Sequence, residues 1–424
     1  NSFHMLPRLV QVADLGGPLL LTALAMAGNG ALYSLLRARF RGERPPRAAP
    51  AVFAGMLVFY VGYGMYRIDE VEGQVASAPK LDVGVVQANM GIFEKREAPG
   101  EGLRRHLEQS RRLVWPESAA TFRLPRDLET PVGPYFDNAL RFYGVDSPGL
   151  PETPVLFGGL SAERRDGRRR LYNTAFLADE NGRVVGHYDK TYLLAFGEYI
   201  PFGETFPVLY EWSPNTGRFT PGEHVRPLEL GEHRIAALVC YEDIIPRFVR
   251  AAVREGRPHL LVNITNDAWF GETQAPYVHL ALAKMRAVGH HRYLVRATNT
   301  GVSAVIVPLG RVVTESPLFE RASLRAEVAL LEAPTLYEQL GDWPGWLAVG
   351  AALYMVLVGR RTRSEPEPPP GTQGRRERVR GRREDDDGDA DDHGAADDVA
   401  DDHGAGHDVA DDHGAGHDGA GAAA

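Results

Sequence analysis

Cysteine is almost absent from this chain, since Cys240 is the only one among its 424 residues. A single cysteine excludes an intrachain disulfide framework and a cysteine-rich zinc site. Two interpretations remain for Cys240: a small buried hydrophobic side chain or a reactive thiol. The sequence also lacks a glycine-rich phosphate loop and paired metal-ligand spacings, so we expect neither a metal nor an organic cofactor.

Basic residues are missing from the C-terminal end of the chain. The net charge is −9, but fifteen of the 56 acidic residues follow Arg383, and no Lys or Arg follows it. The acidity therefore belongs to a tail and says nothing about the partners of the folded part. Residues 362–424 are Pro-rich and basic, then repeat Asp, His, Gly and Ala. Because this composition offers no apolar face to bury, we predict that the tail is disordered.

Charge is also absent from three apolar stretches, residues 15–36, 48–66 and 343–359. The first two are long enough to cross a bilayer as helices. The third is short, but tryptophans mark one end and arginines follow the other, as at membrane interfaces. The alternative for the first stretch is a buried core helix of a soluble domain. We predict three transmembrane helices.

The basic loops predict the orientation of these helices. Five arginines lie between the first two stretches, and three follow the last one. Because basic loops stay cytoplasmic, residues 1–70 form two membrane helices joined by a cytoplasmic loop, and the tail is cytoplasmic as well. The intervening residues, 78–338, must then lie on the outer side of the membrane.

This outer region reads as one α/β domain. Apolar strand patterns alternate with helical ones, which is typical of a layered α/β sandwich. The clearest predicted strands are residues 80–90, 111–118, 153–160, 233–240 and 259–270.

Polar side chains end three of the apolar runs. Cys240 ends a strand just before a helix, where backbone N–H groups can stabilise a thiolate and an oxyanion. Glu117 and Lys190 end two other runs. If the three met at one sheet edge, the carboxylate could take the thiol proton and the ammonium could stabilise negative charge. Each residue alone is ordinary at a strand end.

Four motifs carry a family resemblance: WPES (115–118), YDKTYLLAFGEYIPF (188–202), VCYED (239–243) and NDAWFG (266–271). They resemble the nitrilase superfamily of carbon–nitrogen hydrolases and, within it, the apolipoprotein N-acyltransferases. The resemblance implies an α/β fold, a nitrilase-like αββα sandwich flanked by transmembrane helices.

The resemblance also implies roles for individual residues. Glu117 matches the general base, Lys190 the oxyanion-stabilising lysine and Cys240 the nucleophile. The supporting residues that match are Glu198, Tyr241 and Glu242. Glu198 and Glu242 could instead be ion-pair partners that hold Lys190, and Tyr241 could act through its backbone N–H.

The implied reaction is acyl transfer through a cysteine thioester. A membrane phospholipid is the implied acyl donor, and the acceptor is the α-amine of an S-diacylglyceryl cysteine on an apolipoprotein. We expect a monomer without nucleic-acid partners in the bacterial inner membrane, crossing it several times, with a periplasmic catalytic domain. Family members carry more membrane helices than the three predicted here, so we expect upstream helices to be missing.

Two alternatives remain open on the sequence. One is a membrane-tethered amide hydrolase of nitrilase type, with water as the acyl acceptor. The other is a membrane scaffold without enzymatic activity, against which the intact Glu117, Lys190 and Cys240 argue.

Overall fold

The computed structural model describes residues 2–362, apart from 92–93, 95–96, 110–112, 127, 129, 166 and 215. The predicted disordered tail lies outside the described residues from position 363 onward. The chain divides into two units, Asn1–Val356 and Leu357–Ala424, and the first carries almost every described element.

The N-terminal part consists of helices. Three short ones, η1 (Ser2–Met5), α1 (Pro7–Val10) and α2 (Ala13–Gly16), precede two long ones, α3 (Pro18–Arg41) and α4 (Ala48–Ser77). Both long helices are apolar and long enough to cross a membrane, and little of their most apolar stretches is buried. They pack against each other, with Tyr60 of α4 donating a hydrogen bond to the carbonyl of Leu20 at 2.9 Å.

The region that follows α4 is built on two β-sheets. The first has the order β13-β1-β2-β4-β5-β6, with β3 beside β4. Its strands are β1 (Lys80–Gln87), β2 (Leu113–Val114), β3 (Ala120–Pro125), β4 (Val155–Arg165), β5 (Arg168–Ala178), β6 (Val184–Asp189) and β13 (Ala322–Ala329).

The second sheet has the order β12-β11-β10-β9-β8-β7. Its strands are β7 (Leu228–Leu230), β8 (His233–Val239), β9 (Leu260–Thr265), β10 (Tyr293–Thr298), β11 (Ala304–Ile306) and β12 (Val312–Glu315). Because β8, β9 and β10 run parallel, their carboxyl ends meet at one edge of the sheet.

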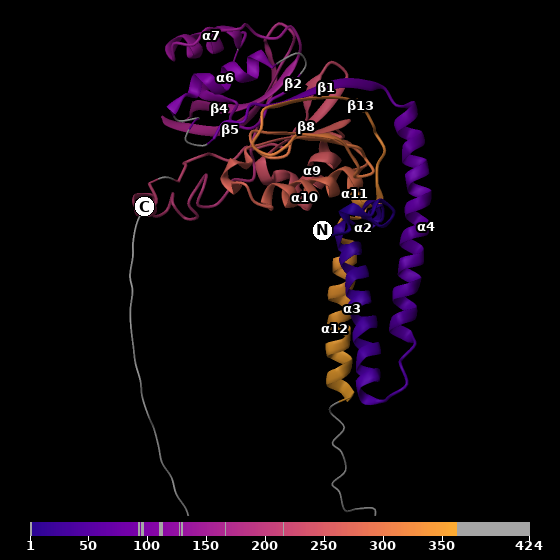
Figure 1. Ribbon diagram of the computed structural model, residues 1–424. Coiled ribbons are helices and arrows are strands. Elements are labelled where there is room, and N and C mark those ends of the chain that lie inside the picture. Colours follow the sequence, from indigo (N-terminus) through magenta and orange to yellow (C-terminus); the bar gives the residue numbers. More distant parts are fainter. Residues whose placement is uncertain are drawn as a thin grey trace, which may run out of the picture. The chain divides into compact units, whose positions relative to one another are not determined.

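Helices cover the outer face of each sheet (Figure 1). Helices α6 (Pro99–Glu108) and α7 (Gly133–Phe142) pack on the first sheet, and α9 (Pro246–Gly256) and α10 (Ala275–His290) pack on the second. Alternate residues of the first sheet face opposite ways. Leu156 joins the core between the sheets, whereas Phe157 joins the core under α6 and α7. The predicted αββα sandwich is therefore confirmed.

The chain leaves the sandwich through α11 (Leu336–Leu340) and α12 (Trp343–Thr362). The apolar part of α12, Trp343–Val358, is shorter than α3 or α4, but its side chains are exposed, Trp346 at 76%. A third membrane span at 343–359 stays a prediction.

A buried polar cluster joins α4 to the sandwich. Asp14 of α2, only 1% exposed, accepts hydrogen bonds from Tyr63 at 2.8 Å and from Nε of Arg67 at 2.6 Å. On its other side Nε2 of His291, which follows α10, lies 3.2 Å from the same carboxylate. One short helix thus contacts both the long apolar helix and the sandwich.

Candidate active site

Cys240 lies where β8 gives way to the 3-10 turn η2 (Cys240–Ile244). Its φ is +57°, a left-handed conformation that is uncommon for a residue other than glycine and costs on the order of 1–3 kcal/mol. The neighbouring strand β9 holds this turn. Nδ2 of Asn263 donates to the carbonyl of Cys240 at 2.9 Å and to that of Leu238 at 3.2 Å.

Glu117 lies between β2 and β3, where its side chain is buried. One carboxylate oxygen accepts a hydrogen bond from Nδ2 of Asn173 at 2.6 Å, and the other accepts the backbone N–H of Asn266 at 3.0 Å. Burial raises the pKa of Glu117, although the positive charge of Lys190 opposes this. A carboxylate with a raised pKa is suited to take up and return a proton near neutral pH.

Lys190 directly follows β6 and is 1% exposed. Its Nζ lies 2.8 Å from a carboxylate oxygen of Glu198 and 3.9 Å from one of Glu117. Burial lowers the pKa of Lys190, but the charges of Glu117, the Cys240 thiolate and Glu198 outweigh it, so the net shift is upward. The side chain therefore remains an ammonium.

Asn173 of β5 connects the two glutamates. Its Nδ2 donates to Glu117 at 2.6 Å and to Glu198 at 2.9 Å, and its carbonyl accepts the backbone N–H of Lys190 at 2.8 Å. Glu198 also accepts the backbone N–H of Leu194 at 2.8 Å, which closes the loop that follows Lys190. One amide thus fixes the spacing of base, lysine and second glutamate.

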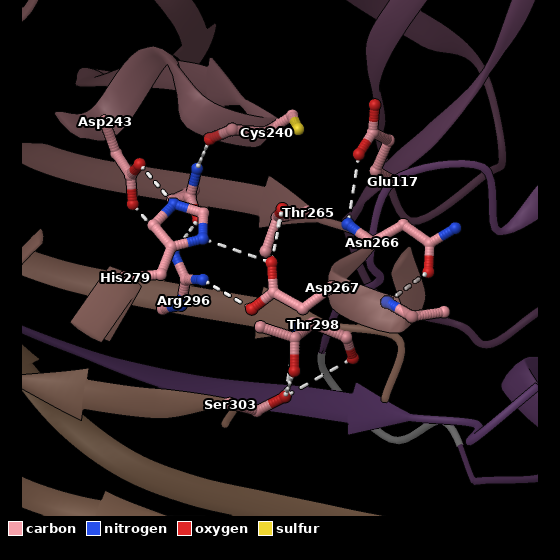
Figure 2. A network of polar contacts seen from close by, with 12 residues as sticks. Glu117, Cys240, Asp243, Thr265, Asn266, Asp267, His279, Arg296, Thr298 and Ser303 are labelled. Atoms are coloured by element: carbon pink, nitrogen blue, oxygen red, sulfur yellow. Dashed lines mark hydrogen bonds and ion pairs between the residues drawn. The ribbon is translucent and has the colours of Figure 1, made fainter. Parts of the chain in front are cut away.

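The thiol of Cys240 belongs to the same electrostatic group. Burial raises the pKa of Cys240, the negative charge of Glu117 raises it further, and Lys190 lowers it. In Figure 2 the sulfur points toward the side on which Glu117 lies. A thiol with a raised pKa needs a base to ionise, and the pair of Glu117 and Lys190 provides a base and a compensating cation.

Tyr241 and Glu242 follow the cysteine but face different partners. The ring of Tyr241 lies 5.2 Å from Nζ of Lys190, and its hydroxyl donates to the carbonyl of Leu193 at 2.8 Å. Glu242 is fully buried and accepts the backbone N–H of Val239 at 2.8 Å. Its hydrogen bonds go to the nucleophile turn and to the loop after Lys190, and burial raises its pKa against the weaker, lowering effect of the positive charge of Lys190.

The three histidines that could have served as bases are buried. They are His279, His290 and His291, and His279 lies between Asp243 and Asp267. Within the described ranges, no group of three or more His, Cys, Asp or Glu side chains is arranged to hold a metal ion.

Comparison with known proteins identifies the family of this chain. Residues 152–333 match the carbon–nitrogen hydrolase family. The apolipoprotein N-acyltransferase of Geobacter metallireducens is 34% identical over 380 residues, which cover 85% of this chain and 69% of that protein. This chain belongs to the apolipoprotein N-acyltransferase family.

Two further family members agree. The apolipoprotein N-acyltransferase of Rhodopseudomonas palustris is 31% identical over 74% of this chain and 60% of its own length. That of Bradyrhizobium diazoefficiens is 31% identical over 85% of this chain and 68% of its own length. The predicted family, and with it the class of N-acyltransferases, is confirmed. The chain spans roughly two thirds of the length of these relatives.

The structure brings together most residues that the motifs predicted for the site of this family. Lys190 forms ion pairs with both Glu117 and Glu198, and the charges of all three act on Cys240. Sequence reasoning missed Asn173. The only signal in the sequence was that Asn173 is a polar residue at the start of an apolar run, NTAFLA (173–178).

Proposed function

We propose that this chain transfers a fatty acyl chain from a membrane phospholipid to an apolipoprotein. The acceptor is the α-amine of the N-terminal S-diacylglyceryl cysteine. The observation that carries the proposal is the convergence of Glu117, Lys190 and Cys240 in a member of the apolipoprotein N-acyltransferase family.

In the first half-reaction Glu117 takes the proton of the Cys240 thiol, and the thiolate attacks the sn-1 ester carbonyl of the phospholipid. The ammonium of Lys190 stabilises the negative charge on the carbonyl oxygen. When the intermediate collapses, the C–O bond breaks, the lysophospholipid oxygen takes the proton from Glu117, and the acyl chain stays on sulfur as a thioester.

In the second half-reaction the neutral amine of the acceptor attacks the thioester carbonyl. Glu117 takes the amine proton, the C–S bond breaks, and Cys240 regains its proton as the amide is released. The thioester splits one hard transfer into two easier ones, and no cofactor takes part. Glu198, Tyr241 and Glu242 support the site.

We place the enzyme in the bacterial inner membrane as a monomer that crosses it several times, without a nucleic-acid partner. The arginines between α3 and α4 support a cytoplasmic loop there, and hence a periplasmic site and a cytoplasmic tail. Exposed aromatic side chains near the site support contact with lipid: Phe196, Phe202, Phe206, Trp212 and Trp269.

The amide-hydrolase alternative is the weaker one. It needs only water as acceptor, and it gives no reason for exposed aromatic side chains beside the site or for two long apolar helices.

A labelled donor tests the proposal. The full chain in phospholipid vesicles, given a donor with a radiolabelled sn-1 chain, should acquire a hydroxylamine-sensitive label at Cys240. A diacylglyceryl peptide with a free α-amine should discharge the label, and its N-acetylated form should not. Cys240→Ala should remain unlabelled. Equal discharge by water alone would establish the hydrolase, and an unlabelled wild-type chain would reject the thioester mechanism.

A further inference from the structure

Arg296 lies in β10, at the centre of the second sheet, and its side chain is completely buried. Nη1 donates to Asp243 at 2.7 Å and to Oδ1 of Asn263 at 2.6 Å, and Nη2 donates to Asp267 at 2.8 Å (Figure 2). A buried ion pair is weak evidence for stability, because desolvation offsets the attraction. The network therefore calls for another explanation.

One branch of this network leads to the nucleophile. Asn263 accepts a hydrogen bond from Arg296 through Oδ1, and its Nδ2 donates a hydrogen bond to the carbonyl of Cys240 at 2.9 Å. Asp243 belongs to the same turn η2 as Cys240. Arg296 thus holds the turn η2 in two ways, through Asn263 of the neighbouring strand and through Asp243 of the turn itself. Cys240 adopts its left-handed conformation at the start of this turn.

The other branch leads to the base. Asp267 begins the turn η3 (Asp267–Phe270), and the residue before it, Asn266, donates its backbone N–H to Glu117 at 3.0 Å. The site at Asp267 is tightly packed, since a Cβ on Gly301 would lie 2.4 Å from its carboxylate. Asp267, held by Arg296, fixes the position of the backbone group that holds Glu117.

His279 completes the network. It lies between Asp243, at 2.8 Å, and Asp267, at 3.1 Å. Burial and Arg296 lower the pKa of His279, but the two aspartates outweigh them and raise it. Burial raises the pKa of Asp267, and Arg296 and His279 lower it to about 2. Arg296 and His279 thus both face the two aspartates beneath the site.

We propose that Arg296 is a positioning residue that sets the separation of Cys240 from Glu117, acting through Asn263 and Asp243 on one side and through Asp267 on the other. It touches neither substrate nor the reacting atoms. The role of Arg296 in catalysis rests on the proposed function, but its effect on Cys240 can be measured without acyl transfer.

Arg292 provides a matched control. It is also a buried arginine and lies four residues earlier, just before β10 begins, where it donates to the carbonyls of Pro258 at 2.7 Å and Ala333 at 2.9 Å. Arg296→Gln should lower kcat on the order of 100-fold with KM changed less than about twofold, because small misplacements of reacting groups carry such losses. Arg292→Gln should lower the melting temperature similarly and leave kcat per folded molecule nearly unchanged.

A second readout does not depend on acyl transfer. Because Cys240 is the only cysteine, its alkylation by iodoacetamide can be followed against pH in the full chain. The midpoint should shift in Arg296→Gln, because the position of Cys240 relative to Glu117 and Lys190 changes, and it should stay in place in Arg292→Gln. If the wild-type chain transfers no acyl group, the proposed function fails, and this readout still decides the inference.

Asn263→Leu keeps the volume and the net charge but removes the tie between Arg296 and Cys240. It should also lower kcat by at least about tenfold with little change in KM. This variant carries the test if Arg296→Gln does not fold. Equal loss of kcat in Arg296→Gln and Arg292→Gln, or an unchanged kcat in Asn263→Leu, would overturn the proposal.

Discussion

At the scale of the residue, Glu242 shows how one carboxylate can hold two chain segments. One oxygen accepts the backbone N–H groups of Thr191 at 2.8 Å and Tyr192 at 3.0 Å, and the hydroxyl of Tyr188 at 2.9 Å. The other accepts the N–H of Val239 at 2.8 Å. All four donors lie beside Lys190 or Cys240, so Glu242 fixes the start of the loop against the nucleophile turn.

Replacing Glu242 with glutamine should destabilise the protein at pH 5, because the new amide N–H₂ must face at least one backbone N–H. We expect a loss of about 1–3 kcal/mol, the cost of a buried donor without an acceptor. Thermal unfolding of the detergent-solubilised chain would measure it.

The size of that loss should depend on pH. Burial raises the pKa of Glu242 from 4.5 to about 7. Between these values the folded wild type binds more protons at this position than the unfolded chain, so its stability falls as the pH rises. The glutamine does not titrate. The difference in stability between wild type and variant should therefore shrink from pH 5 to pH 7, and a widening difference would contradict the assignment.

At the scale of the element, strand β4 packs closely against the backbone that carries Glu117. A Cβ added to Gly158 would lie 2.6 Å from Cα of Glu117 and 2.7 Å from the carbonyl oxygen of Pro116. These are backbone atoms and cannot turn aside. The close contact of β4 with the turn at Glu117 requires glycine at this position.

Gly158→Ala should therefore displace Glu117 from Asn173 and Asn266 and reduce kcat by at least about tenfold. Single-turnover formation of the thioester would measure this. Gly73→Ala in α4 is the control, since nothing lies within 4 Å of the added Cβ. It should leave kcat unchanged and keep or raise stability, by up to about 1 kcal/mol. Normal thioester formation in Gly158→Ala would show that β4 does not place the base.

The sequence predicts where strands end better than it predicts which strands pair with each other. Cys240 and Lys190 could be placed because each ends an apolar run, and strand ends are visible in the pattern. Asn173 and Arg296 could not, because their roles depend on which strands pair. Arg296 meets Asn263 only because β10 lies beside β9, and Asn173 meets Lys190 only because β5 pairs with β6.

At the scale of the whole molecule, Asp14 connects α4 to the catalytic region. Arg67→Met would leave this buried carboxylate without its closest cation, at 2.6 Å. We expect a loss of about 3 kcal/mol, as for other buried pairs broken by removing one partner. Arg104→Met is the control, because Arg104 of α6 is far more accessible than Asp14, 31% against 1%, and its pair with Glu101 should contribute under about 1 kcal/mol.

Chemical denaturation of the full chain in detergent would compare the two variants. Adding Asp14→Asn to Arg67→Met should restore part of the stability, since it removes the unpaired charge. Equal losses in the two single variants would show that the Asp14 cluster contributes no more than a surface pair.

The two sheets divide the chemical groups between them. Glu117 and Lys190 come from the ends of strands in the first sheet, and Cys240 comes from the second. Neither sheet alone could therefore activate a thiol, however well it formed. In a growing or refolding chain, selective reactivity of the single thiol would begin only when the two sheets have packed against each other, so it would report directly on the assembly of the sandwich.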